Sequence, residues 1–342
     1  MRIILLPLSW IYGAVVWLRN VGYNKNIFDT YTPKIKTIVL GNLSLGGTGK
    51  TPHAAYLLQL LGAEKTAFLS RGYGRKSGET IEVKSNMSAA ETGDEPLQMA
   101  FKFPEARIVA DAKRKRGLEY LARFPETQTV VLDDALQHRK IKGGLNILLT
   151  TWQKPFFEDH YLPAGDLRDS RMRARDADIL VVTKCPETIP AKRLEVIRKK
   201  LEYLHKPIFF SKISYDEIVP VNAVSPIAVS QIKDILLVTG IAKPAVYADH
   251  VAKHFNIKEH FEYRDHHQFT QSDLQRFRNF IGSFAPGQIA ILTTEKDAMR
   301  LLPFVQNAPF DTLPLFYWAI SVDFGEDQNA FDKLICDYAY KP

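Results

Sequence analysis

The chain has 342 residues, which is enough to bury a full core and to form two domains. Hydrophobic residues make up 46% of it, which excludes a largely disordered protein. The net charge of +7 favours an acidic partner, such as a nucleotide, an anionic membrane or a phosphorylated substrate. The two cysteines, Cys185 and Cys336, lie far apart without the spacing of zinc ligands, so a reducing compartment fits best.

The first segment is hydrophobic. Residues 3–18 are almost wholly apolar, contain Trp10 and Trp17, and are flanked by Arg2 and Arg19. The segment is shorter than the roughly 20 residues of a membrane-spanning helix, and no small-residue cleavage pattern follows it, which argues against a secretory signal. Two alternatives remain, a helix in the membrane interface with aromatic anchors and a buried core helix, and we favour the first.

A glycine-rich loop follows a short aliphatic strand and precedes an amphipathic helix. Successive amide N–H groups of such a loop form an anion cradle, to which the start of the helix adds its positive dipole end. Lys50 is predicted to reach the β- and γ-phosphates of a nucleotide, and the Thr51 hydroxyl to bind magnesium. Ser44 stands where the usual motif begins with glycine, so a glycine-rich turn without a ligand is the alternative. The residues predicted to bind phosphate are Ser44, Leu45, Gly46, Gly47, Thr48, Gly49, Lys50 and Thr51.

Three loops downstream carry candidate substrate residues. Residues 70–76 end a strand with glycines, arginines and a tyrosine, which indicates either a substrate loop or an exposed turn. Asp94, in the first turn of the next helix, is either a carboxylate favoured by the helix dipole or a functional group. The Pro/Gly loop at residues 162–169 contains one arginine and is followed by Arg171, Arg173 and Arg175, which indicates bidentate phosphate binding or a solvated basic loop.

A pair of acidic residues gives the second strong signal. The apolar run at residues 129–132 leads directly into Asp133 and Asp134. Carboxylates at the carboxyl end of a parallel strand are typical of sites that hold magnesium beside a nucleotide. Asp133, Asp134 and Thr51 are therefore the predicted metal ligands.

A second unit follows an irregular stretch at residues 215–229, where we place the domain boundary. Strands and helices alternate again after it, up to a final helix over residues 328–338. Asp265 and His266 come directly after a strand, where an Asp–His pair can act as an acid–base element, although lone histidines are more often structural.

Taken together, these motifs follow the order of one known family. The chain closely resembles tetraacyldisaccharide 4′-kinase, the lipid A 4′-kinase of Gram-negative bacteria, over nearly its whole length. The resemblance is carried by residues 41–52, 70–74, 93–96, 133–138, 163–168, 182–186, 265–266 and 294–297.

The elements and this resemblance imply an α/β fold. We expect a P-loop NTPase-like, mainly parallel sheet with helices on both faces, a smaller α/β C-terminal domain and a hydrophobic N-terminal helix. The expected boundaries are 1–20 for the membrane-associating helix, 21–215 for the kinase core, and 216–342 for the domain that closes over the active site.

The resemblance also implies a lipid kinase. Such an enzyme transfers the γ-phosphate of ATP to the 4′-hydroxyl of tetraacyldisaccharide 1-phosphate and gives lipid IVA in lipid A biosynthesis. The implied cofactor is Mg²⁺, and the implied partners are ATP and the acylated glucosamine disaccharide 1-phosphate, with no nucleic acid. We expect a monomer at the cytosolic face of the bacterial inner membrane, peripheral or shallowly inserted.

Catalytic roles are carried over by resemblance to three residues. Lys50 clamps the phosphates, Asp94 matches the proposed catalytic base, and His266 assists it in an Asp–His dyad that spans the two domains. The positions that match contacts to the lipid substrate are Arg71, Tyr73, Gln137, His138, Arg168 and Asp169. The family often has glutamate where this chain has Asp169, which is a departure toward a shorter acid.

Two other classes of protein compete with this interpretation. A membrane-associated P-loop ATPase switch that acts on a protein partner is the main alternative, but Leu45 stands where the partition-type switches carry an extra lysine. Residues 183–186 lack the aspartate that reads guanine in common GTPases. A metal-inserting chaperone would need a cluster of soft ligands, and two isolated cysteines do not provide one.

Overall fold

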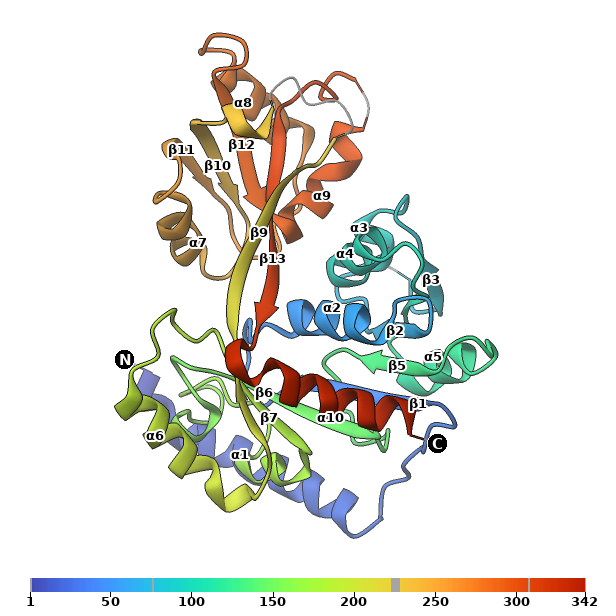
Figure 1. The fold of residues 1–342 in the computed structure, drawn as a ribbon. Coiled ribbons are helices and arrows are strands. Elements are labelled where there is room, and N and C mark those ends of the chain that lie inside the picture. Colours follow the sequence, from blue (N-terminus) through green and yellow to red (C-terminus); the bar gives the residue numbers. More distant parts are fainter. Residues whose placement is uncertain (1, 76, 223–227, 307, 342) are drawn as a thin grey trace.

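The computed structural model describes residues 2–75, 77–222, 228–306 and 308–341, which fold around two sheets (Figure 1). The larger sheet has eight strands in the order β3-β4-β2-β5-β1-β6-β7-β8, and its neighbouring strands are parallel except for β3 and β4. Its strands are β1 (Lys36–Asn42), β2 (Thr66–Ser70), β3 (Ile81–Val83), β4 (Ile108–Ala110), β5 (Thr129–Leu132), β6 (Leu145–Thr151), β7 (Ile179–Thr183) and β8 (Ile208–Phe210). The helices of this part of the chain are α1 (Leu6–Asn24), α2 (Lys50–Leu61), α3 (Ala89–Thr92), α4 (Asp94–Lys102), α5 (Arg114–Leu121) and α6 (Ala191–Leu201).

Alternate residues of the central strand β1 supply two separate cores. Ile38 and Leu40 belong to the apolar cluster that includes residues of α2 and α4, whereas Val39 belongs to the cluster that includes residues of α5 and α6. Because the side chains of a strand point alternately to opposite faces, helices cover the sheet on both sides. This confirms the predicted α/β fold with a mainly parallel sheet.

Helix α1 lies on the surface of the larger unit. The Tyr12 hydroxyl donates a hydrogen bond to the Arg168 carbonyl over 3.0 Å, and the Asn20 side-chain amide donates one to Asp169 over 2.8 Å. Among the residues that the structure describes, no helix is both long and apolar enough to cross a membrane. The large apolar side chains of α1 and the preceding turn that remain exposed are Ile4, Leu8, Trp10, Ile11, Val15, Trp17 and Leu18.

The smaller sheet has five strands in the order β11-β10-β12-β13-β9. Its neighbouring strands are parallel except for β13 and β9, which form a long antiparallel pair. The strands are β9 (Lys212–Pro220), β10 (Asp234–Thr239), β11 (Asn256–Glu262), β12 (Ile289–Thr294) and β13 (Leu315–Asp323), and the helices are α7 (Pro244–Val251), α8 (Gln271–Ile281) and α9 (Glu295–Val305). The short 3-10 helices of the chain are η1 (Arg2–Leu5), η2 (Phe156–Glu158), η3 (Arg171–Asp176), η4 (Glu202–Leu204), η5 (Val229–Gln231) and η6 (Gly325–Asp327).

The last helix, α10 (Gln328–Tyr340), returns to the larger sheet (Figure 1). The Tyr338 hydroxyl donates a hydrogen bond to the Thr37 carbonyl of β1 over 3.0 Å, and the Tyr56 hydroxyl of α2 donates one to Asp332 over 2.6 Å. Helix α10 thus falls within the range 216–342 but packs on the larger unit. The smaller sheet is therefore inserted between β8 and α10, with β9 and β13 as its two connections.

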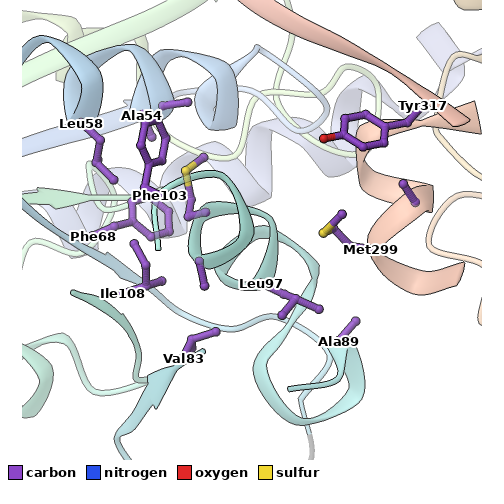
Figure 2. Close-up of a cluster of buried hydrophobic side chains, with 14 of the residues drawn as sticks. Ala54, Leu58, Phe68, Val83, Ala89, Leu97, Phe103, Ile108, Met299 and Tyr317 are labelled. Atoms are coloured by element: carbon purple, nitrogen blue, oxygen red, sulfur yellow. The ribbon is translucent and has the colours of Figure 1, made fainter. Parts of the chain in front are cut away.

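One apolar cluster continues from the larger unit into the smaller one. Figure 2 shows Leu97 of α4 and Phe68 of β2 in the same cluster as Met299 of α9 and Tyr317 of β13. All four side chains are buried. This packing sets the start of α9 against the start of α4, which is where the polar site forms.

Candidate active site

The phosphate loop joins β1 to α2 at the carboxyl edge of the larger sheet. Gly46 and Gly49 have φ angles of +101° and +85°, which L side chains rarely adopt. A Cβ added to Gly47 would lie 3.7 Å from Lys184 Nζ, so a second lysine flanks the loop. The Thr48 hydroxyl is buried and has no hydrogen-bond partner in the part of the chain that the structure describes. The loop therefore combines the backbone conformation and the nearby cation that an anion site requires.

Lys50 lies between this loop and the predicted metal carboxylates. Its Nζ is 3.5 Å from Asn42 Oδ1, at the end of β1, and 3.6 Å from Asp134 Oδ1. Thr51 is buried in the first turn of α2. The side chains of Lys50 and Thr51 thus start from the helix end at which a nucleotide phosphate is stabilised.

The two aspartates after β5 have opposite electrostatic surroundings. Burial would raise the pKa of Asp134, but Lys50 and the Arg168 guanidinium, 2.9 Å from Oδ2, outweigh it and lower that pKa. Burial, followed by the neighbouring Glu95 carboxylate, raises the pKa of Asp133 to about 7. Oδ1 of Asp133 is buried and accepts no hydrogen bond from any described residue. A buried oxygen of this kind is suited to a cation.

Asp94 is the first residue of α4 and pairs with His266 of the smaller unit. It follows Gly93, where a Cβ would lie only 2.9 Å from the Cα of Gly72, so glycine is needed for the two loops to approach. His266 Nδ1 lies 3.1 Å from Asp94 Oδ2. The Asp94 hydrogen bond raises the pKa of His266. Burial alone would raise the pKa of Asp94, but hydrogen bonds from His266 and Arg300 lower it to about 2.

Three charged residues at this site, Arg300, Lys296 and Glu95, were assigned no individual function in the sequence analysis. Arg300 Nε donates a hydrogen bond to Asp94 Oδ2 over 2.9 Å, and Lys296 Nζ lies 3.0 Å from Glu95 Oε1. Lys296 and Arg300 are four residues apart on α9, so both cations lie on one face of this helix. That spacing was visible in the sequence, but only the packing of α9 on α4 identifies the carboxylates that the cations meet.

Four of the residues predicted to contact the lipid surround the same edge of the sheet. Tyr73 is exposed, and its ring centroid lies 6.0 Å from that of His266. Burial and then the charges of Arg114 and Arg71 lower the pKa of His138 to about 4, so Arg71 lies within electrostatic reach of His138. The side-chain amide of Gln137 donates to the Asn42 carbonyl, next to the phosphate loop.

The two remaining residues of that set make other contacts. The Arg168 guanidinium pairs with Asp134 and also donates to the side-chain oxygen of Asn42. Asp169 is fully buried and accepts hydrogen bonds from the Asn20 side-chain amide of α1 and from the backbone amide of Ser170. In this structure Arg168 faces the predicted phosphate and metal residues, and Asp169 joins its loop to α1.

Comparisons with known proteins agree along the whole chain. The model of the family Tetraacyldisaccharide-1-P 4′-kinase, LpxK, matches residues 1–339. The tetraacyldisaccharide 4′-kinase of Phocaeicola vulgatus is 38% identical over 98% of this chain and 95% of its own. That of Flavobacterium johnsoniae is 38% identical over 99% of this chain and 97% of its own. A crystal structure of the "apo" form of LpxK from Aquifex aeolicus in complex with ATP is 27% identical, covers 99% of both chains and superposes with a TM-score of 0.77. The chain therefore belongs to the tetraacyldisaccharide-1-P 4′-kinase family.

Proposed function

We propose that this protein transfers the γ-phosphate of ATP to the 4′-hydroxyl of tetraacyldisaccharide 1-phosphate and forms lipid IVA. The observation that carries the proposal is the Asp94–His266 pair, whose neighbour Glu95 lies within electrostatic reach of Lys50 of the phosphate loop, in a chain that matches the family over residues 1–339. The pair offers an acceptor for the hydroxyl proton, and the loop offers a cradle for the donor nucleotide. A membrane-associated ATPase switch would need the loop but has no use for this pair.

On the donor side, the loop amides and Lys50 bind the β- and γ-phosphates. The residues present also fit Mg²⁺, because Thr51, Asp133 and Asp134 are hard oxygen donors and Asp133 Oδ1 has no hydrogen-bond partner among the described residues. When bound, the ion would neutralise charge on the phosphates. Lys50 and the loop amides then stabilise the charge that spreads over the equatorial oxygens of the transferring group.

On the acceptor side, Asp94 orients the sugar hydroxyl and receives its proton. The hydroxyl oxygen forms a bond to the γ-phosphorus, the bond between that phosphorus and the bridging oxygen breaks, and ADP leaves with the electron pair. A carboxylate with a low pKa is a weak base. In the loose transition state of phosphoryl transfer, however, the position of the attacking hydroxyl matters more than early removal of its proton. Asp94 therefore acts first as an orienting acceptor of a hydrogen bond.

We further propose that α1 holds the enzyme at the cytosolic face of the inner membrane as a monomer, peripheral or shallowly inserted. Support comes from its exposed face, which carries two tryptophans among aliphatic side chains while the opposite face bonds to the 164–169 loop. Such a helix matches an interfacial anchor, with aromatic rings at the headgroup level. Arg19 of α1 donates a hydrogen bond to the Gln137 carbonyl over 2.7 Å, so this helix adjoins a residue predicted to contact the lipid.

The proposal is tested with the purified full-length protein, magnesium, γ-labelled ATP and the disaccharide 1-phosphate lipid in detergent. Label on the lipid that disappears in an Asp94→Asn variant is the expected result. Hydrolysis of ATP without labelled lipid would contradict the proposal and favour the ATPase switch.

A further inference from the structure

Helix α9 presents a buried arginine to the proposed base. Arg300 has a side chain that is 1% exposed, and that of Asp94 is 10% exposed. Nε of Arg300 donates to Asp94 Oδ2 over 2.9 Å, and Nη2 donates to the same oxygen. Nη2 also lies 3.1 Å from His266 Nδ1. The guanidinium thus touches both members of the Asp94–His266 pair.

The guanidinium is itself held in place by the smaller unit. Its Nη1 donates to the Gly240 carbonyl over 3.0 Å and to Asp297 Oδ1 over 2.8 Å. The other oxygen of Asp297 accepts hydrogen bonds from the Gly240 amide over 2.9 Å and from the Thr294 hydroxyl over 2.7 Å. A planar guanidinium whose three nitrogens all donate hydrogen bonds is held in one orientation, so it fixes the position of the group that it binds.

From this geometry we propose that Arg300, together with His266, is a positioning residue of Asp94. It holds Oδ2 and leaves Oδ1 as the oxygen that faces the acceptor hydroxyl. The inference rests on the proposed function of Asp94 as the proton acceptor. All the hydrogen bonds that Arg300 and His266 make to Asp94 end on Oδ2, so the carboxylate plane is set from one side only.

Adhesion between the two units does not account for this arginine. Lys296 and Glu95 form a more exposed ion pair at the same contact, Lys102 and Glu295 lie 3.7 Å apart nearby, and Met299 adds apolar packing. Burying a charged pair costs desolvation energy, and an apolar pair of similar volume often stabilises a contact as well or better. A buried Arg–Asp pair is therefore better explained by the need for an ionised and oriented carboxylate.

The ionisation of Asp94 depends on a small set of groups. Arg300, His266 and Lys296 bring positive charge to it, and Asp297 and Asp265 bring negative charge to the same cluster. Without Arg300, burial would be opposed by fewer cations, and the pKa of Asp94 would rise. Because the active form is the carboxylate, activity would then fall at higher pH than in the wild type as the solution is acidified.

The test compares Arg300→Met and Arg300→Lys with Arg278→Met, which changes an exposed arginine of α8 in the same unit. We expect kcat to fall about 100-fold in Arg300→Met while KM for ATP changes less than about twofold, with partial recovery in Arg300→Lys. The acid limb of the pH–rate profile should move to higher pH in Arg300→Met, and Arg278→Met should match the wild type.

Wild-type kcat in a folded Arg300→Met, or an unshifted acid limb with equal losses in the Met and Lys variants, would overturn the inference. If Arg300→Met does not fold, the acid limb and kcat of Arg300→Lys decide the question. The Asp94→Asn variant distinguishes the proposed role of Asp94 as the base from the proposed positioning role of Arg300. Near-normal turnover in Asp94→Asn would refute the base itself, whereas an inactive Asp94→Asn beside a fully active Arg300→Met would refute only the positioning role.

Discussion

His266 Nδ1 lies 3.1 Å from Asp94 Oδ2, although the two residues are 172 positions apart and belong to units built on different sheets. Neither unit alone contains the complete acid–base pair. In the proposed mechanism, activity therefore depends on the contact between α9 and α4 as well as on the residues of the phosphate loop.

Removal of Asp94 and removal of His266 should lower the transfer activity to different extents. We expect Asp94→Ala to abolish transfer and His266→Ala to lower kcat less, about 10- to 100-fold, because the histidine orients the carboxylate without accepting the substrate proton. Single-turnover labelling of the lipid measures both. An equal or larger loss in His266→Ala would reverse this ranking.

The phosphate clamp can be tested independently of the lipid. Lys50→Ala should abolish transfer and weaken ATP binding, because the ammonium is the cation that extends from α2 toward the phosphates. Calorimetric titration with a non-hydrolysable ATP analogue measures the binding step. Lys65→Ala, which removes an exposed lysine just beyond the same helix, is the matched control. Near-normal turnover in Lys50→Ala would refute the clamp.

Membrane binding should depend on the exposed face of α1. Trp10 and Trp17 are 70% and 56% exposed, so a Trp10→Glu/Trp17→Glu variant should fold normally and no longer sediment with vesicles of anionic lipid. Val246→Glu alters a residue of the smaller unit that is 66% exposed and should leave sedimentation unchanged. If the double variant still sediments with the vesicles, the anchor lies elsewhere.

The two metal-side aspartates should affect stability in opposite directions. Burial and Glu95 raise the pKa of Asp133 to about 7, above its value in the unfolded chain, so its unfavourable charge appears in the folded state as pH rises through about 7. Because the unfolded carboxyl ionises at lower pH, the stability penalty builds up from that pH to about 7. Asp133→Asn should therefore raise Tm at pH 8, by about 2 °C or more, and raise it less at pH 5 in magnesium-free buffer.

Asp134 is the matched comparison for that experiment. Lys50 and Arg168 outweigh burial and lower its pKa, so its stabilising charge is present above the unfolded pKa and is lost only as pH falls through the folded value. Asp134→Asn should lower Tm at pH 8. Both variants should lose activity, and a lower Tm for Asp133→Asn at pH 8 would contradict the assigned environment of Asp133.

Local patterns allowed the larger sheet and the nucleotide side of the site to be predicted. The phosphate loop needs only a strand, glycines and a helix in one continuous stretch, and Asp133 and Asp134 follow directly from a buried strand. Parallel strands end at one edge, so these local features were bound to meet. The pairing of Asp94 with His266 came instead from the resemblance to the family, because no local pattern links the two units.

The rest depended on tertiary packing that sequence patterns do not report. Residues 215–229 were expected to be irregular, yet β9 extends through Pro220, because its backbone is paired with β13 although none of its side chains is fully buried. A strand without a buried face lacks the alternation that reveals strands in a sequence. The roles of Arg300 and Lys296 could likewise not be predicted, since their partners belong to a helix about 200 residues earlier in the chain.

The return of α10 to the larger sheet also has a consequence for biosynthesis. Phe331 and Ile335 of this helix are buried in the apolar cluster that covers one face of that sheet, and Lys36 at the start of β1 donates a hydrogen bond to the Ala339 carbonyl over 3.2 Å. During translation, the part of that face that α10 covers stays exposed until α10 leaves the ribosome. The kinase core is therefore expected to complete its folding only once α10 has emerged, long after helix α1 has been made.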